Sequence, residues 1–352
     1  MTFDKLIIVT RQTRLNESLK RYNTKSQVKF FIESRGQSFA DYELENDNYD
    51  RARDLILKSV PGDLRYQVID RSFLPNFIFG PHDLVLTLGQ DGLVVNTAKY
   101  LDGQPVLAVN PDPARFDGVL LPFQLADVAQ ALEQTLDPDA NNRLGTREIS
   151  MGRVDLNDGQ HLLAFNDFFI GANSHISARY TINFGAASER HSSSGVIVST
   201  PAGSTGWLSS LYNMARGIQQ FQGDPAAWDG QPLEWDQRRL VFVVREPFQS
   251  KWSGASLVAG QIEAEKKLII ESHMPEKGVI FSDGIESDYL EFNSGSQATI
   301  GLARQVTRLL VPAGWHKPTP GEQPPVPARP PKKAPETGLK RKSSPPVRKR
   351  RK

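Results

Sequence analysis

The sequence of 352 residues contains no cysteine. This absence excludes disulfide-stabilised folds, thiolate zinc sites, iron–sulfur clusters and cysteine nucleophiles. Histidine is also scarce, at six residues, and the two most conspicuous, His175 and His191, lack partners at metal-ligand spacing. We therefore expect no metal site built from protein side chains. Chemistry in this protein depends on carboxylates, hydroxyls, imidazoles, amines or a cation brought in by a ligand.

Long hydrophobic runs are absent as well. The longest, such as Leu240 to Val244, fall far short of the roughly 20 apolar residues that a bilayer span needs. Met1 to Lys5 leads directly into Leu6 to Val9 without the hydrophobic region of a signal peptide. We therefore expect a cytoplasmic protein with no membrane insertion, or a nuclear one if it is eukaryotic, because its C-terminus is basic.

The net charge of +2 combines two regions of opposite sign. Residues 316–352 contain 12 Lys and Arg, two Glu and 10 of the 24 prolines, which leaves the rest of the chain acidic. Few large apolar side chains occur here, so we expect a disordered tail. Its clustered cations would contact polyanions such as nucleic acid or anionic lipid, or a nuclear-import receptor; the alternative is a solvated tail without a partner.

Residues 1–140 alternate between strand-like and helix-like patterns. Apolar runs predict strands at 6–10, 66–69, 84–88 and 106–109. Apolar residues at helical spacing predict helices at 15–32, 49–60, 93–101 and 125–136. This alternation predicts an α/β domain with a parallel sheet covered on both faces.

Residues 141–315 consist of short extended segments separated by turns, which predicts a β-rich second domain. The predicted strands lie at 162–165, 168–170, 178–184, 196–199, 240–244, 257–262, 268–271, 279–281 and 305–311. Asp158-Gly159 and Asp283-Gly284 are dipeptides that supply positive φ in hairpin loops. The segment 111–146 would connect the two domains.

The first candidate site follows the strand Leu84 to Leu88, where Gly89-Gln90-Asp91-Gly92 opens a predicted helix. A strand that passes through glycines into a helix start leaves free backbone N–H groups, which favour phosphate. Asp91 would repel that anion unless it takes a proton from an incoming hydroxyl or works beside a divalent cation. The alternative is an ordinary Asp-Gly turn.

A second candidate site lies between the strand 196–199 and a helical pattern that starts at Trp207. It contains Thr200, Gly203, Ser204 and Thr205. Glycine allows close backbone approach, and the hydroxyls can donate to phosphate or ribose oxygens. The alternative is a plain helix N-cap at Ser204 or Thr205.

The polar pair Asn166-Asp167 lies between two apolar runs. If it is buried, its side chains must be hydrogen-bonded. Asn166 offers two donors and an acceptor, and Asp167 can accept from both hydroxyls of a ribose. A structural turn is the competing interpretation.

Together these segments resemble the NAD kinase family, and the resemblance runs from about Phe3 to Val311. Five motifs occur in the order and at the approximate spacing of that family: GQDG, NDFFIG, SSSGVIVSTPAGSTGW, VVREPF and FSDG. Thr13-Arg14 and the segment Val109 to Pro113 are most similar to the mitochondrial-type branch of animals and plants.

The resemblance implies a kinase that transfers the terminal phosphoryl group of ATP to the adenosine-ribose 2′-hydroxyl of NAD or NADH. The fold would pair an N-terminal α/β domain, which contains the phosphate loop Gly89 to Gly92, with a C-terminal β-rich domain. Asp91 matches the family's general base, Asn166 and Asp167 match its dinucleotide-holding pair, and Thr200 to Thr205 matches its substrate turn. Mg²⁺ would arrive with the triphosphate. A homo-oligomer is also expected.

Three departures from the family pattern bear on specificity. Gln90 replaces a glycine, which leaves open whether ATP or polyphosphate is the donor. Ser194 stands where most of the family has an aspartate, so nicotinamide recognition must be made differently. Asp167 replaces a glutamate and shortens the reach by one methylene.

Two other functions stay open. The protein would be a non-catalytic NAD-binding regulator if Gln90 has made the phosphoryl-donor site non-functional. A lipid or sugar kinase of the wider superfamily would use a related loop, although the Asn166-Asp167 pair speaks against a lipid. Under the kinase hypothesis, we expect truncation after Pro312 to leave activity intact.

Overall fold

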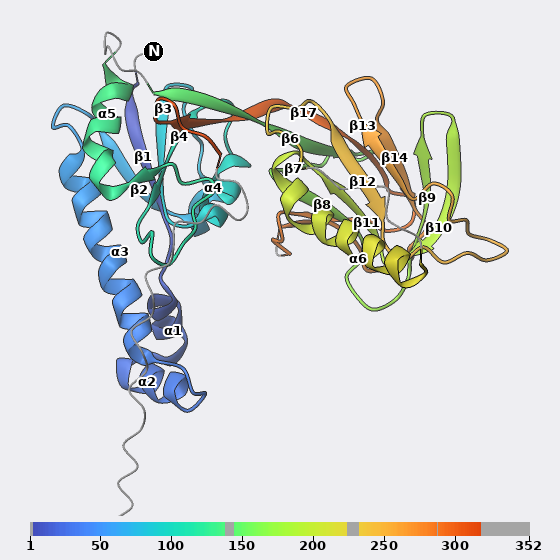
Figure 1. The fold of residues 1–352 in the computed structure, drawn as a ribbon, viewed down its shortest axis with the longest axis horizontal. Helices are drawn as coiled ribbons and strands as arrows, with labels where there is room; N and C mark the ends of the chain where they lie inside the picture. The colour runs from blue at the N-terminus through green and yellow to red at the C-terminus, as the bar shows by residue number, and fades with distance from the viewer. Residues whose placement is uncertain (1–2, 138–143, 224–231, 287, 318–352) are drawn as a thin grey trace, which may run out of the picture. The chain divides into compact units, whose positions relative to one another are not determined.

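A parallel sheet forms the first part of the chain in the computed structural model, which describes residues 3–137, 144–223, 232–286 and 288–317 (Figure 1). Its strands run in the order β2, β1, β3, β4, and the short β5 pairs with β4. All six residues of β3 are buried, as expected for a strand covered on both faces. The strands are β1 (Lys5–Thr10), β2 (Tyr66–Asp70), β3 (Asp83–Leu88), β4 (Pro105–Asn110) and β5 (Phe123–Gln124).

Helices cover both faces of this sheet, because successive strand side chains point to opposite sides. Leu6 and Ile8 pack with α3 (Phe39–Ser59) and α5 (Val128–Leu136), which follows the short helix η2 (Leu125–Asp127). Ile7 and Val9 pack with α4 (Asp91–Ala98) and η1 (Arg71–Asn76) on the other side.

The helix predicted at 15–32 is instead two helices, α1 (Arg14–Tyr22) and α2 (Lys25–Glu33). Asn23 ends α1 with a φ of 63°, and the Thr24 side chain caps α2 by accepting from the Gln27 backbone N–H. The two helices pack against the end of α3, which begins at Phe39 rather than Tyr49 (Figure 1).

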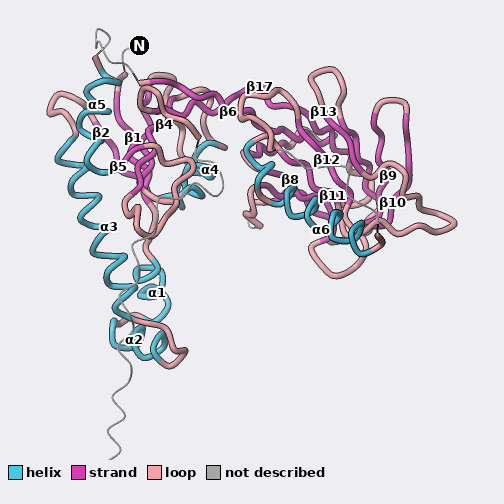
Figure 2. Tube along the Cα trace, in the orientation of Figure 1, coloured by secondary structure: helices cyan, strands magenta, loops and turns pink. Residues whose placement is uncertain are grey.

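The β-rich part consists of a six-stranded antiparallel sheet packed against the antiparallel arm of the first sheet. Phe168, Tyr180 and Phe242 lie fully buried between the two layers. The helix α6 (Trp207–Phe221) contacts the outer face of the six-stranded sheet through Leu211. Figure 2 shows that strands dominate this part of the chain. The strands are β8 (Asp167–Ala172), β9 (Ala178–Phe184), β10 (Ala187–Ser193), β11 (Val196–Ser199), β12 (Leu240–Val244), β13 (Ala259–Ile262), β14 (Leu268–Ser272), β15 (Gly278–Ser282) and β16 (Tyr289–Glu291).

Two long strands join the parallel and antiparallel regions: β6 (Gly145–Leu156) and β17 (Gln297–Val311). β17 pairs with β6 and β14, and its Arg308 and Leu309 also pair in parallel with β4. β6 turns back through Gly159, with a φ of 92°, into β7 (His161–Ala164). The end of β17 therefore belongs to the N-terminal sheet, which local sequence did not indicate.

The predicted fold class, a parallel α/β region with a β-rich region, is confirmed. The described residues up to Lys317 belong to one compact unit, and residues 318–352, which hold most of the predicted tail, lie outside the described residues. The exact domain boundaries stay a prediction. No described helix combines the length and the apolar character that crossing a membrane requires.

Candidate active site

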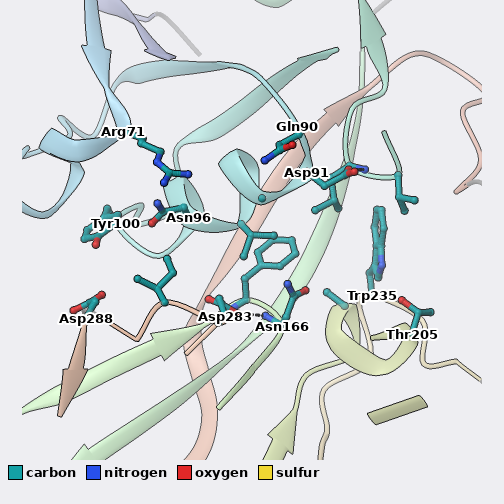
Figure 3. Close-up of a pocket in the computed structure, with 18 of the residues that line it drawn as sticks. Arg71, Gln90, Asp91, Asn96, Tyr100, Asn166, Thr205, Trp235, Asp283 and Asp288 are labelled. Carbon is teal, nitrogen blue, oxygen red and sulfur yellow. Dashed lines mark hydrogen bonds between the residues drawn. The ribbon is translucent and has the colours of Figure 1, made fainter. Parts of the chain in front are cut away.

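A cavity of about 800 Å³ contains several of the predicted site residues (Figure 3). Gln90, Asp91 and Gly92 line it from the α/β region, and Asn166 and Thr205 line it from the β-rich region. Segments that are far apart in sequence thus meet at one site. Its other polar or aromatic lining residues include Arg71, Asn96, Tyr100, Trp235, Asp283, Asp288 and Lys317.

The loop that presents Asp91 is tightly packed at Gly89, whereas Gln90 leaves the following helix without a side-chain cap. The Gly89 N–H donates to the Val109 carbonyl at 3.3 Å, and a Cβ on Gly89 would lie 2.9 Å from the Leu93 side chain. Gln90 is the N-cap of α4 but forms no side-chain capping bond. The first turn of α4 therefore faces the cavity without a capping side chain, a geometry that suits an anion.

Asp91 is anchored and partly desolvated. Its Oδ1 accepts a hydrogen bond from the Leu120 backbone N–H at 2.6 Å. Burial raises the pKa of Asp91 above its usual value, and the nearby Asp117 charge adds to this, although the bond from Leu120 opposes both. A carboxyl group with a raised pKa is a better proton acceptor near neutral pH.

The second glycine-containing turn contributes mainly structure. Thr205 ends the short helix η3 (Ala202–Thr205) and lines the cavity, whereas Thr200, Gly203 and Ser204 do not. The Thr200 N–H donates to the Asn166 carbonyl at 2.8 Å, and its hydroxyl donates to the Phe165 carbonyl. Ser204 accepts from the Leu233 N–H at 2.9 Å. This turn therefore fixes the backbone that carries Asn166.

Gly203 is required by a close backbone approach. A Cβ at this position would lie 2.1 Å from the Asn166 carbonyl oxygen. No side chain fits in that gap, so the glycine allows the turn to pack directly on the start of β8.

Asp283 is a structural residue of the site, whereas the sequence indicated it only as part of an Asp-Gly turn and of the FSDG motif. Its carboxylate accepts from the backbone N–H groups of Phe165, Asn166 and Asp167, at 3.1, 2.6 and 3.3 Å. Figure 3 shows Asp283 beside Asn166. The backbone adopts φ values of 56° at Asp283 and 70° at Gly284, which aims the side chain back at the strand. The Asp-Gly dipeptide and the FSDG motif were the available signals.

Asp167 is not among the cavity-lining residues. Because side chains alternate along β8, the Asp167 side chain lies on the same face of the sheet as Phe169 and on the opposite face from Asn166. Burial, helped by the neighbouring Asp283 charge, raises the pKa of Asp167 to about 7. Burial also raises the pKa of Asp283, and the three N–H donors and the Lys99 charge oppose this rise without cancelling it.

Lys99 also supports the site, and no local pattern indicated it. Its side chain is 3% exposed, and its Nζ lies 3.2 Å from Asp288 Oδ2. Lys99 is the C-cap of α4, and Asp288 follows the turn that contains Asp283. This ion pair therefore links the helix that starts at Asp91 to the loop that holds Asn166.

No group of three or more metal-ligating side chains occurs among the residues that the structure describes. The carboxylates of the cavity do not by themselves form a divalent-cation site. Most oxygen ligands of a Mg²⁺ ion at this site would have to come from a bound phosphate or from water.

Comparisons with known proteins give a fold but no close relative. No protein-family model and no curated protein sequence matches the chain. An NAD kinase from Archaeoglobus fulgidus, solved in complex with ATP, is 16% identical over 86% of this chain and 92% of its own, with a TM-score of 0.49. Yeast NADH kinase, solved with NADH, is 15% identical over 87% of this chain and 83% of its own, with a TM-score of 0.54. The likeness to yeast NADH kinase and the observed sheets confirm the two-part fold implied by the resemblance to the NAD kinase family, whereas the mitochondrial-type branch stays a prediction.

Proposed function

We propose that this protein is a kinase that phosphorylates the adenosine-ribose 2′-hydroxyl of NAD or NADH and forms NADP(H). The observation that carries the proposal is the shared cavity: Asp91, Asn166 and Thr205 line it from distant segments. The uncapped first turn of α4 adds an anion-binding backbone beside the carboxylate. Phosphoryl transfer needs mainly this kind of alignment and charge compensation.

In the proposed reaction Asp91 is the general base. The 2′-hydroxyl oxygen bonds to the terminal phosphorus of the donor, and its proton passes to the Asp91 carboxylate. The bond from that phosphorus to the bridging oxygen breaks, and ADP leaves with the electron pair when ATP is the donor. Because a carboxylate accepts several hydrogen bonds, Asp91 can keep its bond from Leu120 while it takes this proton.

The dinucleotide would be held by side chains and by an aromatic surface. The backbone of Asn166 is already bonded to Asp283 and Thr200, which leaves its amide side chain to bind the ligand. Thr205 offers a hydroxyl, and Trp235 offers an apolar face for a base.

Asp167 would contact the dinucleotide only on the other side of β8. A second cavity of about 480 Å³ lies on that side, lined by Phe169, Trp207 and Arg245 among others. Asp167 lines neither this cavity nor the first, so its contact with the dinucleotide stays a prediction. In this proposal Thr200, Gly203 and Ser204 shape the site and do not touch the ligand.

The test is product formation by the purified full chain. The protein is incubated with Mg²⁺, with NAD or NADH, and with ATP or polyphosphate, and 2′-phosphorylated product is separated and quantified. D91N serves as the matched control, because it keeps the side-chain volume and the oxygen that accepts from Leu120. Absence of product with every donor, in a protein that retains its fold, contradicts the proposal.

A non-catalytic NAD-binding regulator is the second candidate, and Gln90 favours it. This side chain lines the cavity at the position where the resembling family has glycine. The same assay separates the two functions, because the regulator binds NAD without forming product. The polar lining from Asp91, Asn166 and Asp283 disfavours a lipid substrate. Oligomerisation and cytoplasmic location stay predictions.

A further inference from the structure

The residues after β17 turn back onto the cavity. The Trp315 N–H donates to the Pro312 carbonyl at 3.0 Å, and Arg147 donates to the Trp315 carbonyl at 3.2 Å. The rings of Trp315 and Trp235 stack with centroids 6.0 Å apart. The predicted tail starts at residue 316, but the packed structure continues through Lys317.

Lys317 brings a cation into the cavity that contains Asp91 and Thr205. Its Nζ lies 4.9 Å from the centroid of the Trp235 ring, within cation–π distance. In Figure 3, Trp235 lies on the same side of the cavity as Asp91 and Thr205, away from Arg71 and Tyr100.

The cation is not paired with a carboxylate, although the Glu234 charge acts on it. Within the described part of the chain, Lys317 forms no ion pair, and the cavity acids Asp288 and Asp283 are engaged by Lys99 and by three backbone N–H groups. Burial lowers the pKa of Lys317, and the Glu234 charge only partly opposes this. An ammonium group that is partly desolvated and unpaired gains more from a bound anion than an exposed one does.

We propose that Lys317 binds a phosphate group of the nucleotide ligand beside the first turn of α4. This inference rests on the proposed function, because it takes the ligand to be a nucleotide. Two phosphates have the required chemistry, namely the terminal phosphoryl group of the donor and the 2′-phosphate of NADP. Lys317 would supply a point charge, and its ammonium lies over the ring of Trp235, which stacks with Trp315.

The test compares K317M with K317R. Methionine keeps an unbranched apolar stem on Trp235 and removes the charge, whereas arginine keeps the charge. ATP, NADP and NAD are titrated separately, and binding is followed by tryptophan fluorescence because two indoles border the site. A charge-assisted bond of about 1.5–3 kcal/mol corresponds to a loss of affinity of roughly 10- to 150-fold in K317M, which K317R should largely restore.

The ligands identify which phosphate Lys317 holds. Weaker binding of ATP alone assigns Lys317 to the donor phosphate, and weaker binding of NADP but not NAD assigns it to the 2′-phosphate. Unchanged affinities for ATP and NADP overturn the inference. Equal losses for NAD and NADP overturn it as well, because they indicate a general disturbance of the site.

A pair of truncations tests the same residue without a point substitution. Truncation after Pro318 keeps Lys317 and should bind like the full chain. Truncation after Pro312, which the sequence alone predicted to be harmless, should instead show at least the loss seen in K317M, because it removes Trp315 and Lys317. Identical binding by both truncations contradicts the inference. Binding is measured without turnover, so a full chain that binds NADP but forms no product overturns the kinase proposal alone. A chain that binds neither ATP nor NADP overturns both.

Discussion

The two glycine-containing turns of this protein look alike in sequence but act differently in the structure. The loop Gly89 to Gly92 presents Gln90, Asp91 and Gly92 to the cavity. The turn Thr200 to Thr205 directs most of its polar groups inward, where they bond to the start of β8 and its neighbours. Glycines and hydroxyls after a strand therefore indicate a tight turn, but they do not show whether its side chains face a ligand or the protein.

The largest expected effect is on turnover, at the first turn. D91N should lower product formation by about 10²- to 10⁴-fold, because it removes the proton acceptor, while NAD affinity changes little. Steady-state assays and a separate NAD titration measure the two quantities. Turnover at the level of the unmodified protein would remove Asp91 from its role as base.

A buried acid beside the second turn should make stability depend on pH. Because the pKa of Asp167 rises to about 7 on folding, the folded state binds more protons than the unfolded state between about pH 4 and 7. Stability should therefore fall as pH rises through this window and level off above it.

D167N removes this ionisation. The variant should be more stable than the unmodified protein above pH 7, by a few kcal/mol at most (~1.4 kcal/mol per pKa unit), and similar to it below pH 4. Urea unfolding at several pH values measures the difference. D158N, at the exposed β6–β7 hairpin, is the control and should show no such gain. A pH-independent difference in D167N would contradict the assigned pKa.

Glycine-to-alanine substitutions in the two turns should differ in their effect on the free energy of unfolding. G203A forces a Cβ to within 2.1 Å of the Asn166 carbonyl oxygen, and we expect a loss of about 1–3 kcal/mol in the free energy of unfolding. G92A meets no heavy atom within 4 Å, so its unfolding should be nearly normal. Equal stability of the two variants in urea would show that the second turn does not pack on β8 as described.

The smallest effect is expected at Asn166. N166A removes a side chain that lines the cavity but leaves the backbone bonds to Asp283 and Thr200. NAD affinity should fall by about 1 kcal/mol, or roughly fivefold, with little change in kcat, because the interaction is made equally in the ground and transition states. A fall in kcat without a change in affinity would contradict a substrate-holding role.

Buried strands were predictable, and polar edge strands were not. The predicted strands 178–184, 196–199 and 240–244 have the observed bounds, because apolar runs and alternation reflect burial directly. β10, with the sequence ASERHSS, was not predicted, since it pairs only with β9 at the edge of the sheet and has little apolar character. Likewise, the break at Asn23 depends on one residue with positive φ inside a helical pattern.

The site was predictable only where short motifs marked it. Asp91 and Asn166 follow buried strands, and the structure brings both to one cavity. Asp283, Lys99 and Lys317 were not assigned to the site from sequence. Their partners lie more than 80 residues away along the chain, and no periodicity or spacing encodes such a contact.

Composition and local pattern were sufficient to specify the fold class, the two candidate turns and the acidic residue between glycines, because these features depend on neighbours in sequence. Which turn faces the cavity, which carboxylate anchors the backbone and which lysine enters the cavity depended on packing between remote strands. Burial and charge at the site arise from those remote contacts, so they exist only once β17 has joined the two sheet regions and the residues after it have packed on Trp235.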